Sequence, residues 1–232
     1  MLTLKRHLRA FTDLIYPRIC TGCGYVLLAG ENTICSSCIA DIPYTGFENL
    51  PENPVSELFW GRVEIVNAMA MYFFEKSTNC QQMLHELKYN HKRHVGYALG
   101  KLLGQKLTDT IFAGADFVVP VPLHPARERK RGYNQSEVIA LAVSKVIGKE
   151  LIAGNVIRNT YTNTQTKKHR YERWENIQGI FECKNPKLFT NKHILLIDDV
   201  VTTGATIESL AMELLKVPGV TISLATLAVA KG

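Results

Sequence analysis

One stretch of the sequence, residues 193–210, constrains the fold more than any other. It opens with four apolar residues, Ile194 to Ile197, and a short apolar run before a glycine-containing turn is typical of a strand buried on both faces. Two adjacent carboxylates, Asp198 and Asp199, follow this run. A turn rich in hydroxyls comes next, and a helical pattern of apolar residues, from Ile207 to Leu215, starts directly after it. The order therefore predicts a strand, an acidic pair, a turn and a helix N-terminus.

This order suits a ligand that carries a phosphate beside a ribose. The first turn of a helix leaves backbone N–H groups unpaired and carries partial positive charge, so it attracts an anion. Gly204 lets the backbone approach that anion and tolerates a positive φ. Because carboxylates repel a phosphate, we expect Asp198 and Asp199 to face a diol or hydrated Mg²⁺. An ordinary strand-to-helix connection with a capped helix is the alternative.

The segment resembles the binding signature of the type I phosphoribosyltransferases, which is an apolar strand, two acidic residues and then T-T-G-x-T. The resemblance implies that Asp198 and Asp199 hold the ribose hydroxyls of phosphoribosyl pyrophosphate (PRPP), which binds with Mg²⁺. It also implies that the turn cradles the 5′-phosphate. The turn residues concerned are Val201, Thr202, Thr203, Gly204, Ala205 and Thr206.

Length and composition limit the architecture. The 232 residues fit one α/β domain with a small appendage, and the net charge of +6 favours an anionic partner without specifying it. Basic residues interrupt the N-terminal apolar residues, so no secretory signal is expected. No apolar window is long enough to span a membrane, and we expect a cytoplasmic protein. The expected divisions are an N-terminal helix and cysteine module over 1–45, a linker or irregular lid over 46–64, and an α/β domain over 65–232.

Two C-x-x-C pairs predict a metal site near the N-terminus. Paired C-x-x-C units separated by a short loop can place four thiolates tetrahedrally around Zn²⁺. The ligands would be Cys20, Cys23, Cys35 and Cys38. Disulfides are the alternative, but they would not persist in a reducing compartment. Four protein ligands leave no open position, so the zinc would be structural and would stabilise a module too small to build much core.

A second buried strand, residues 117–119, ends in a proline-rich loop that leads into a basic cluster. Ligands of open α/β sheets bind at the carboxyl ends of the strands, so these charges are placed to meet a polyanion such as pyrophosphate. A solvated helix face is the alternative. Further along, the polar stretch from Arg158 carries a second basic run, typical of a functional lid or of a solvated excursion.

The candidate pyrophosphate ligands come from both basic segments and from an earlier L-K-Y tripeptide. They are Lys88, His124, Arg127, Arg131, Lys168 and Arg170. Asp198, Asp199 and Arg170 are the candidate catalytic residues. In type I phosphoribosyltransferases a mobile basic loop occupies this place in the chain order, and the resemblance implies that Lys167, Lys168, His169, Arg170 and Arg173 stabilise departing pyrophosphate.

Taken in order, the cysteine pairs, V-V-P-V-P-L-H-P, R-K-R-G-Y-N-Q, N-T-x-x-Q-T and I-D-D-V-V-T-T-G-A-T resemble the ComF family over nearly the whole chain. The resemblance implies an α/β fold of the type I phosphoribosyltransferase kind, a mostly parallel sheet flanked by helices, with a small N-terminal zinc-binding module. It also implies a cytoplasmic protein associated with uptake of transforming DNA. Possible partners are then PRPP, single-stranded DNA, and a competence helicase or other DNA-uptake proteins.

Three functions remain open from the sequence. The chain could be a phosphoribosyltransferase with an unknown acceptor, or a non-catalytic protein that senses PRPP. It could also bind single-stranded DNA, with the basic clusters supplying charge and aromatic residues stacking on bases. The aromatic candidates are Tyr133, Tyr161, Tyr171 and Trp174. Donor-dependent release of pyrophosphate separates the first function from the second.

Overall fold

The computed structural model describes residues 16–89, 91–159 and 180–230, and its core is a five-stranded sheet. The strand order is β1-β7-β6-β2-β3, and every pairing is parallel. Strands β6 and β7 lie in its interior and are mostly buried, as expected for strands covered on both faces. The bounds are β1 Asn67–Phe74, β2 Phe117–Pro120, β3 Glu150–Leu151, β6 His193–Val201 and β7 Thr221–Ala230.

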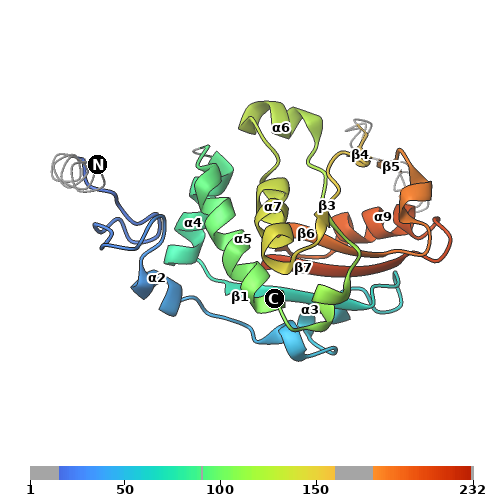
Figure 1. Cartoon of the computed structure of the whole chain (residues 1–232), viewed down its shortest axis with the longest axis horizontal. Coiled ribbons are helices and arrows are strands. Elements are labelled where there is room, and N and C mark those ends of the chain that lie inside the picture. Colours follow the sequence, from blue (N-terminus) through green and yellow to red (C-terminus); the bar gives the residue numbers. More distant parts are fainter. Residues whose placement is uncertain (1–15, 90, 160–179, 231–232) are drawn as a thin grey trace, which may run out of the picture.

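Three helices lie side by side over one face of this sheet: α4 (Asn79–Tyr89), α5 (Arg93–Leu107) and α7 (Gln135–Ile147) (Figure 1). Helices α5 and α7 pack unusually closely because Gly96, Gly100 and Gly104 of α5 face α7. A Cβ at Gly100 would lie 2.6 Å from the carbonyl oxygen of Ile139. The close packing fixes α7, whose N-terminus faces the carboxyl end of β6.

The remaining elements are short. Helix α6 (Pro125–Arg131) follows β2, and α9 (Ala205–Leu214) follows β6. Strands β4 (Val156–Arg158) and β5 (Phe181–Cys183) pair antiparallel as a separate two-stranded sheet. The other elements are α2 Ser36–Ala40, η1 Phe47–Asn49, α3 Pro54–Glu57, η2 Ile111–Gly114 and η3 Pro186–Phe189.

The predicted α/β class is confirmed, and two local details differ from expectation. Strand β6 does not end at Ile197 but continues through Asp198 and Asp199 to Val201, because its pairing with β7 persists to that point. The basic cluster does not extend the proline-rich loop. It forms α6, which begins at Pro125 and is capped by the His124 side chain.

The cysteine module joins the sheet through its last residues (Figure 1). Tyr44 forms an antiparallel bridge with Tyr72, and Thr45 N–H donates to the Met71 carbonyl at 3.0 Å. The segment 46–64, expected as a linker or irregular lid, contains η1 and α3. In it, Asn53 caps α3 and Phe59 is 1% exposed. The division of the chain into three parts stays a prediction. The N-terminal helix is expected over residues 1–16, all of which except Tyr16 lie outside those described.

Candidate functional site

The four predicted metal ligands lie together in space. The Sγ atoms of Cys20, Cys23, Cys35 and Cys38 are all within 4.8 Å of one another. Two of the Sγ–Sγ distances, Cys20 to Cys38 and Cys23 to Cys35, are 3.7 Å. Thiolates about 2.3 Å from a tetrahedral Zn²⁺ are separated by about 3.8 Å, so these distances fit a shared metal and exceed any sulfur–sulfur bond.

The surroundings of these sulfurs also fit thiolates. Gly22 N–H and Cys35 N–H point at the Cys20 Sγ at 3.4 and 3.3 Å. The Asn79 side-chain amide, at the start of α4, donates to the Cys38 Sγ at 3.4 Å. Such donors stabilise negative charge on sulfur and fix the ligand orientation. The cluster could therefore hold a zinc ion.

A second site lies where β2 and β6 end. Here a cavity of about 270 Å³ opens between the N-termini of α7 and α9 and helix α6. Parallel α/β sheets place ligands at this edge. Its lining residues are Lys88, Val121, Pro122, Leu123, Arg127, Arg131, Gln135, Ser136, Arg158, Asp198, Asp199, Val200, Thr202 and Thr206. We call this cavity the strand-end pocket.

The acidic pair forms one wall of the strand-end pocket. The Asp198 Oδ1 accepts a hydrogen bond from the Ser136 hydroxyl at 2.7 Å, and Lys88 Nζ lies 2.8 Å from the Asp199 Oδ2. Burial, and then the neighbouring Asp199 charge, raise the pKa of Asp198 to about 7. Asp198 therefore changes charge near neutral pH, and a cation bound beside it would favour its ionised form.

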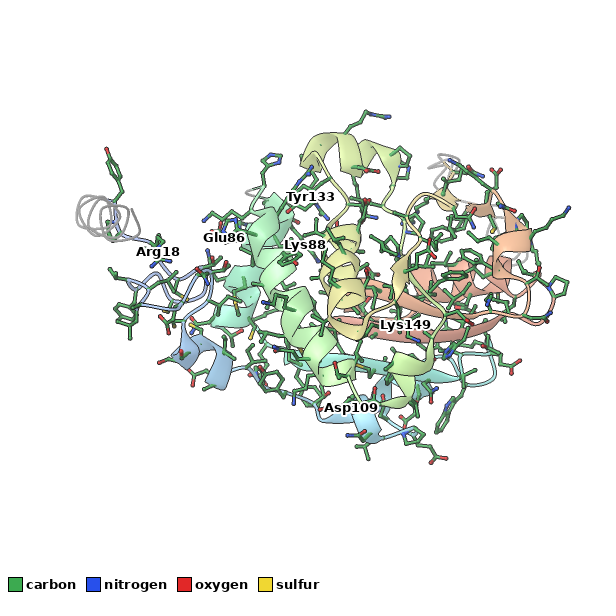
Figure 2. All side chains as sticks on the ribbon, viewed as in Figure 1. Arg18, Glu86, Lys88, Asp109, Tyr133 and Lys149 are labelled. Carbon is green, nitrogen blue, oxygen red and sulfur yellow. The ribbon has the colours of Figure 1, made fainter. Side chains whose placement is uncertain are left out.

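Cationic side chains from three separate elements face this wall. Lys88 comes from α4, Arg127 and Arg131 come from α6, and Arg158 ends β4. Burial, and then the positive charge of Arg127, lower the pKa of Arg158, while Asp198 opposes the shift. Figure 2 shows Lys88 on the side of α4 that faces α7 and Glu86 on the side toward the cysteine module. A polyanion in the strand-end pocket would meet all four cations.

The predicted phosphate turn has the backbone that such a turn requires. Gly204 has φ +76° and precedes α9, and the side chains of Thr202 and Thr206 line the pocket. Val201 is 3% exposed and belongs to the sheet. Thr203, Gly204 and Ala205 are not among the residues that line the cavity, so their assigned role in phosphate binding stays a prediction.

Other sequence-based candidates are placed differently. The His124 ring accepts from Ala126 N–H at 3.1 Å as the cap of α6 and does not line the strand-end pocket. Tyr133 is 6% exposed, with its hydroxyl on the Leu87 carbonyl, so the expectation that it stacks on nucleic-acid bases is wrong. Several candidates lie outside the described residues: Tyr161, Lys167, Lys168, His169, Arg170, Tyr171, Arg173 and Trp174.

The structure adds pocket residues that the sequence did not single out as ligands. Ser136 binds Asp198 directly, and Gln135 accepts from Arg131 at the start of α7. The sequence feature that could have identified Ser136 and Gln135 is their position in G-Y-N-Q-S, immediately after the basic run. Arg158 is the last residue of β4, and only its charge indicated a functional role, because β4 lies far from β6 in the sequence.

The parallel sheet and the strand-end pocket, together with the cysteine module, define an α/β protein with a cavity at the carboxyl ends of its strands. No protein-family model matches the chain. The chain is 30% identical over 141 residues to "DNA utilization protein YhgH" of Escherichia coli K12, covering 58% of this chain and 60% of that protein. The chain is 24% identical over 214 residues to "Competence protein F" of Haemophilus influenzae, and the match covers 85% of this chain and 90% of that protein.

A third relative is "Competence protein ComFC" of Bacillus subtilis, 36% identical over 99 residues that cover 43% of this chain and 38% of the relative. The names of these relatives confirm the predicted resemblance to the ComF family. The chain spans only about three fifths of the length of the YhgH proteins that it matches.

Solved structures with related folds include the glutamine PRPP amidotransferase of B. subtilis. It is 18% identical and has a TM-score of 0.41 over 60% of this chain and 30% of the other. A purine phosphoribosyltransferase of Pyrococcus horikoshii has a TM-score of 0.37 at 18% identity, and the match covers 57% of this chain and 71% of the other. Because these scores are low, the fold class stands on the parallel sheet itself. In the described part of the chain, no helix has the length and apolarity needed to cross a membrane.

Proposed function

We propose that the strand-end pocket binds PRPP with Mg²⁺ and that the protein transfers the phosphoribosyl group to an acceptor, releasing pyrophosphate. One observation carries this proposal: an acidic pair, four cations and the two threonines that flank the glycine turn before α9, Thr202 and Thr206, line one cavity. A diol, a diphosphate and a monophosphate need these three kinds of group. The acceptor is left open, since no residue of the pocket specifies one.

Each part of the pocket has a role in the proposal. Asp198 and Asp199 bind the ribose hydroxyls, and the turn from Thr202 to Thr206 binds the 5′-phosphate. The pyrophosphate lies against the cations of α4, α6 and β4. Lys168 and Arg170 are proposed to join these pyrophosphate-binding cations, and only the resemblance to type I phosphoribosyltransferases supports their role.

The chemistry follows from this placement. The bond between C1 of the ribose and the pyrophosphate oxygen breaks, and C1 passes through an oxocarbenium-like state before it bonds to the acceptor. The pyrophosphate leaves with the bonding electron pair, and the acceptor loses a proton. The cations facing the acidic pair stabilise the departing charge. Mg²⁺, held as a hydrated ion by the donor oxygens and by Asp198 or Asp199, would neutralise part of the diphosphate charge.

The cysteine cluster is proposed to hold a structural Zn²⁺. All four donors are protein thiols, so a tetrahedral ion would have no open position for a substrate. The names of the relatives support a link between this protein and DNA uptake, with single-stranded DNA or a competence helicase as possible partners. A cytoplasmic location is part of the proposal.

Calorimetric titration with PRPP and Mg²⁺ tests donor binding. We expect the wild type to bind and the Asp198→Asn/Asp199→Asn variant to bind at least about tenfold more weakly, because the ribose hydroxyls lose two charged acceptors. Asp116→Asn is a matched control. Asp116 receives His193 N–H at 2.8 Å at the opposite end of β6, so its amide should leave donor affinity unchanged. No binding by the wild type would contradict the proposal.

A second measurement separates catalysis from sensing. Release of pyrophosphate from PRPP, followed with and without candidate acceptors such as ammonia or nucleobases, should rise in an acceptor-dependent way in the wild type. It should be lost in the double variant. Tight donor binding without release for any acceptor would favour the non-catalytic PRPP-sensing alternative.

A further inference from the structure

The segment after α3 packs against the outside of the phosphate turn. Phe59 is 1% exposed, and a Cβ at Gly204 would lie only 2.8 Å from its Cε1 atom. The same Cβ would lie 3.6 Å from the Leu58 Cβ. Two features therefore require a glycine at position 204. Its φ of +76° strains residues with a Cβ, and the Phe59 ring occupies the space that a Cβ would need.

The Arg62 side chain makes three contacts, one within this segment, one with the turn and one with α9. Its Nη1 donates to the Leu58 carbonyl at 2.9 Å, within its own segment, and to the Thr203 carbonyl at 3.1 Å. Its Nη2 forms an ion pair with the Glu208 carboxylate of α9. One guanidinium thus holds the turn and the first turn of the helix that follows it, across more than a hundred residues of sequence.

The carbonyl contact fixes the direction of a peptide group in the turn. In a trans peptide the C=O and the next N–H point in opposite directions. Because the Thr203 oxygen points at Arg62, the Gly204 N–H points away from it. An anion that approaches the turn from the side opposite Arg62 therefore meets an N–H and not a carbonyl oxygen.

The ion pair between Arg62 and Glu208 changes the net charge beside the phosphate turn. Glu208 lies in the first turn of α9, where a carboxylate stabilises the helix but repels a second anion. Pairing with Arg62 offsets that repulsion. Without Arg62, the turn would present a freer peptide group and an unpaired negative charge to a phosphate.

We propose that Arg62 is a positioning residue of the donor site, which sets the peptide orientation and the charge of the phosphate turn without contacting the ligand. The proposal rests on the proposed function in taking the turn as the 5′-phosphate site. It assigns residues 54–63, which lie outside the strand-end pocket, to the support of that site.

The Arg62→Met variant tests the proposal, since methionine retains much of the aliphatic length and removes the guanidinium. We expect the Kd for PRPP with Mg²⁺ to rise about tenfold, from the lost carbonyl contact and the unpaired Glu208. Adding Glu208→Gln should recover a large part of that loss, because it removes the repelling charge. Arg62→Lys should fall between, since lysine keeps the charge but not the two-pronged geometry.

Lys106→Met is the matched control. Lys106 pairs with Glu48 at 3.2 Å, so this variant breaks another ion pair of the segment 46–64 without touching the turn. Its donor affinity should equal that of the wild type. An Arg62→Met variant whose Kd is unchanged, or one whose weaker binding is matched by Lys106→Met and not relieved by Glu208→Gln, would overturn the proposal.

Hydrogen exchange of the ligand-free protein gives a readout that does not depend on PRPP. Arg62→Met should speed exchange in the peptide that contains residues 202–208, and Lys106→Met should not. If the wild type binds no donor, the proposed function fails, while the exchange still reports whether Arg62 orders the turn. Unchanged exchange in Arg62→Met would show that it does not, and would overturn this inference alone.

Discussion

The cysteine module and the strand-end pocket are both predicted ligand sites, but they are built in opposite ways. The four thiols come from one short stretch, Cys20 to Cys38, with only the bridge Ile19–Val26 and α2 between and around them. The pocket gathers residues from Lys88 to Thr206, carried by six different helices and strands and by the loops between them. The comparison teaches that a local site can be completed by a metal, whereas a dispersed site exists only after the sheet has formed.

The two regions are nevertheless joined by one helix. Asn79, the first residue of α4, donates to the Cys38 Sγ, and Lys88, near the end of α4, pairs with Asp199. Figure 2 shows the two sides of α4 facing different regions, through Glu86 and Lys88. Substitutions in the cysteine module and in the strand-end pocket therefore test whether each region is stable independently of the other.

The largest expected effect is removal of the metal. Structural zinc contributes on the order of 10 kcal/mol to the folding of small modules, so a chelator or Cys38→Ser should unfold residues 16–45. The sheet should persist, because its strands pair without the module. Elemental analysis together with hydrogen exchange measures both outcomes.

Cys183→Ser is the control for this change, because Cys183 lies in β5 away from the cluster. It should retain the metal and the exchange pattern of the wild type. Freshly purified protein with less than about half an equivalent of zinc would contradict the metal assignment.

The next effect is Lys88→Met, which leaves the Asp199 carboxylate without its cation. The Asp199 side chain is 8% exposed, so we expect the free energy of unfolding to fall by about 3 kcal/mol, the lower end for a broken buried pair because Lys88 is 26% exposed. Adding Asp199→Asn should restore most of it. Urea unfolding of the ligand-free protein measures both changes.

An exposed ion pair provides the contrast. Lys192 lies 3.2 Å from Asp116, and both side chains are about two fifths exposed, so Lys192→Met should cost less than about 1 kcal/mol. Equal losses for Lys88→Met and Lys192→Met would mean that the buried charge of Asp199 is solvated by some other route.

The same contrast between local and dispersed sites explains what the sequence could predict. The C-x-x-C spacing and the order of strand, acidic pair, turn and helix are short-range patterns. The structure clusters the four cysteines, and Asp198, Asp199, Thr202 and Thr206 line one cavity. The strand end was misplaced at Ile197 because pairing with β7, not local composition, carries β6 to Val201.

Long-range partners were beyond the reach of the sequence. Nothing near Ser136 indicates that its hydroxyl binds Asp198, and nothing near Arg62 indicates the Thr203 carbonyl. The prolines of segment 46–64 suggested a linker or lid, yet Phe59 and Arg62 of this segment pack on the phosphate turn. These contacts depend on how the chain crosses the sheet, which hydrophobic periodicity does not encode.

The smallest predicted effect concerns pH and the dispersed site alone. Burial, and then the Asp199 charge, raise the pKa of Asp198 to about 7, against an unfolded value near 3.9. Between these values the folded state binds more protons than the unfolded state, so this group's contribution to stability is full below about pH 4 and is lost as the pH rises toward 7. The slope is at most about 1.4 kcal/mol per pH unit.

Asp198→Asn should remove this slope, and the difference between variant and wild type is the quantity to measure. The difference is needed because burial lowers the pKa of His193, which contributes a slope of opposite sign in part of the same range. Asp116→Asn is again the control. A hydrogen bond from His193 N–H lowers the pKa of Asp116, so this carboxylate changes the stability only at pH values below about 4.

Because bound Mg²⁺ favours ionised Asp198, PRPP binding at about pH 6 should also release protons in the wild type and fewer in Asp198→Asn. Titrations in two buffers of different ionisation enthalpy would detect this, and equal release by both proteins would place the titrating group elsewhere.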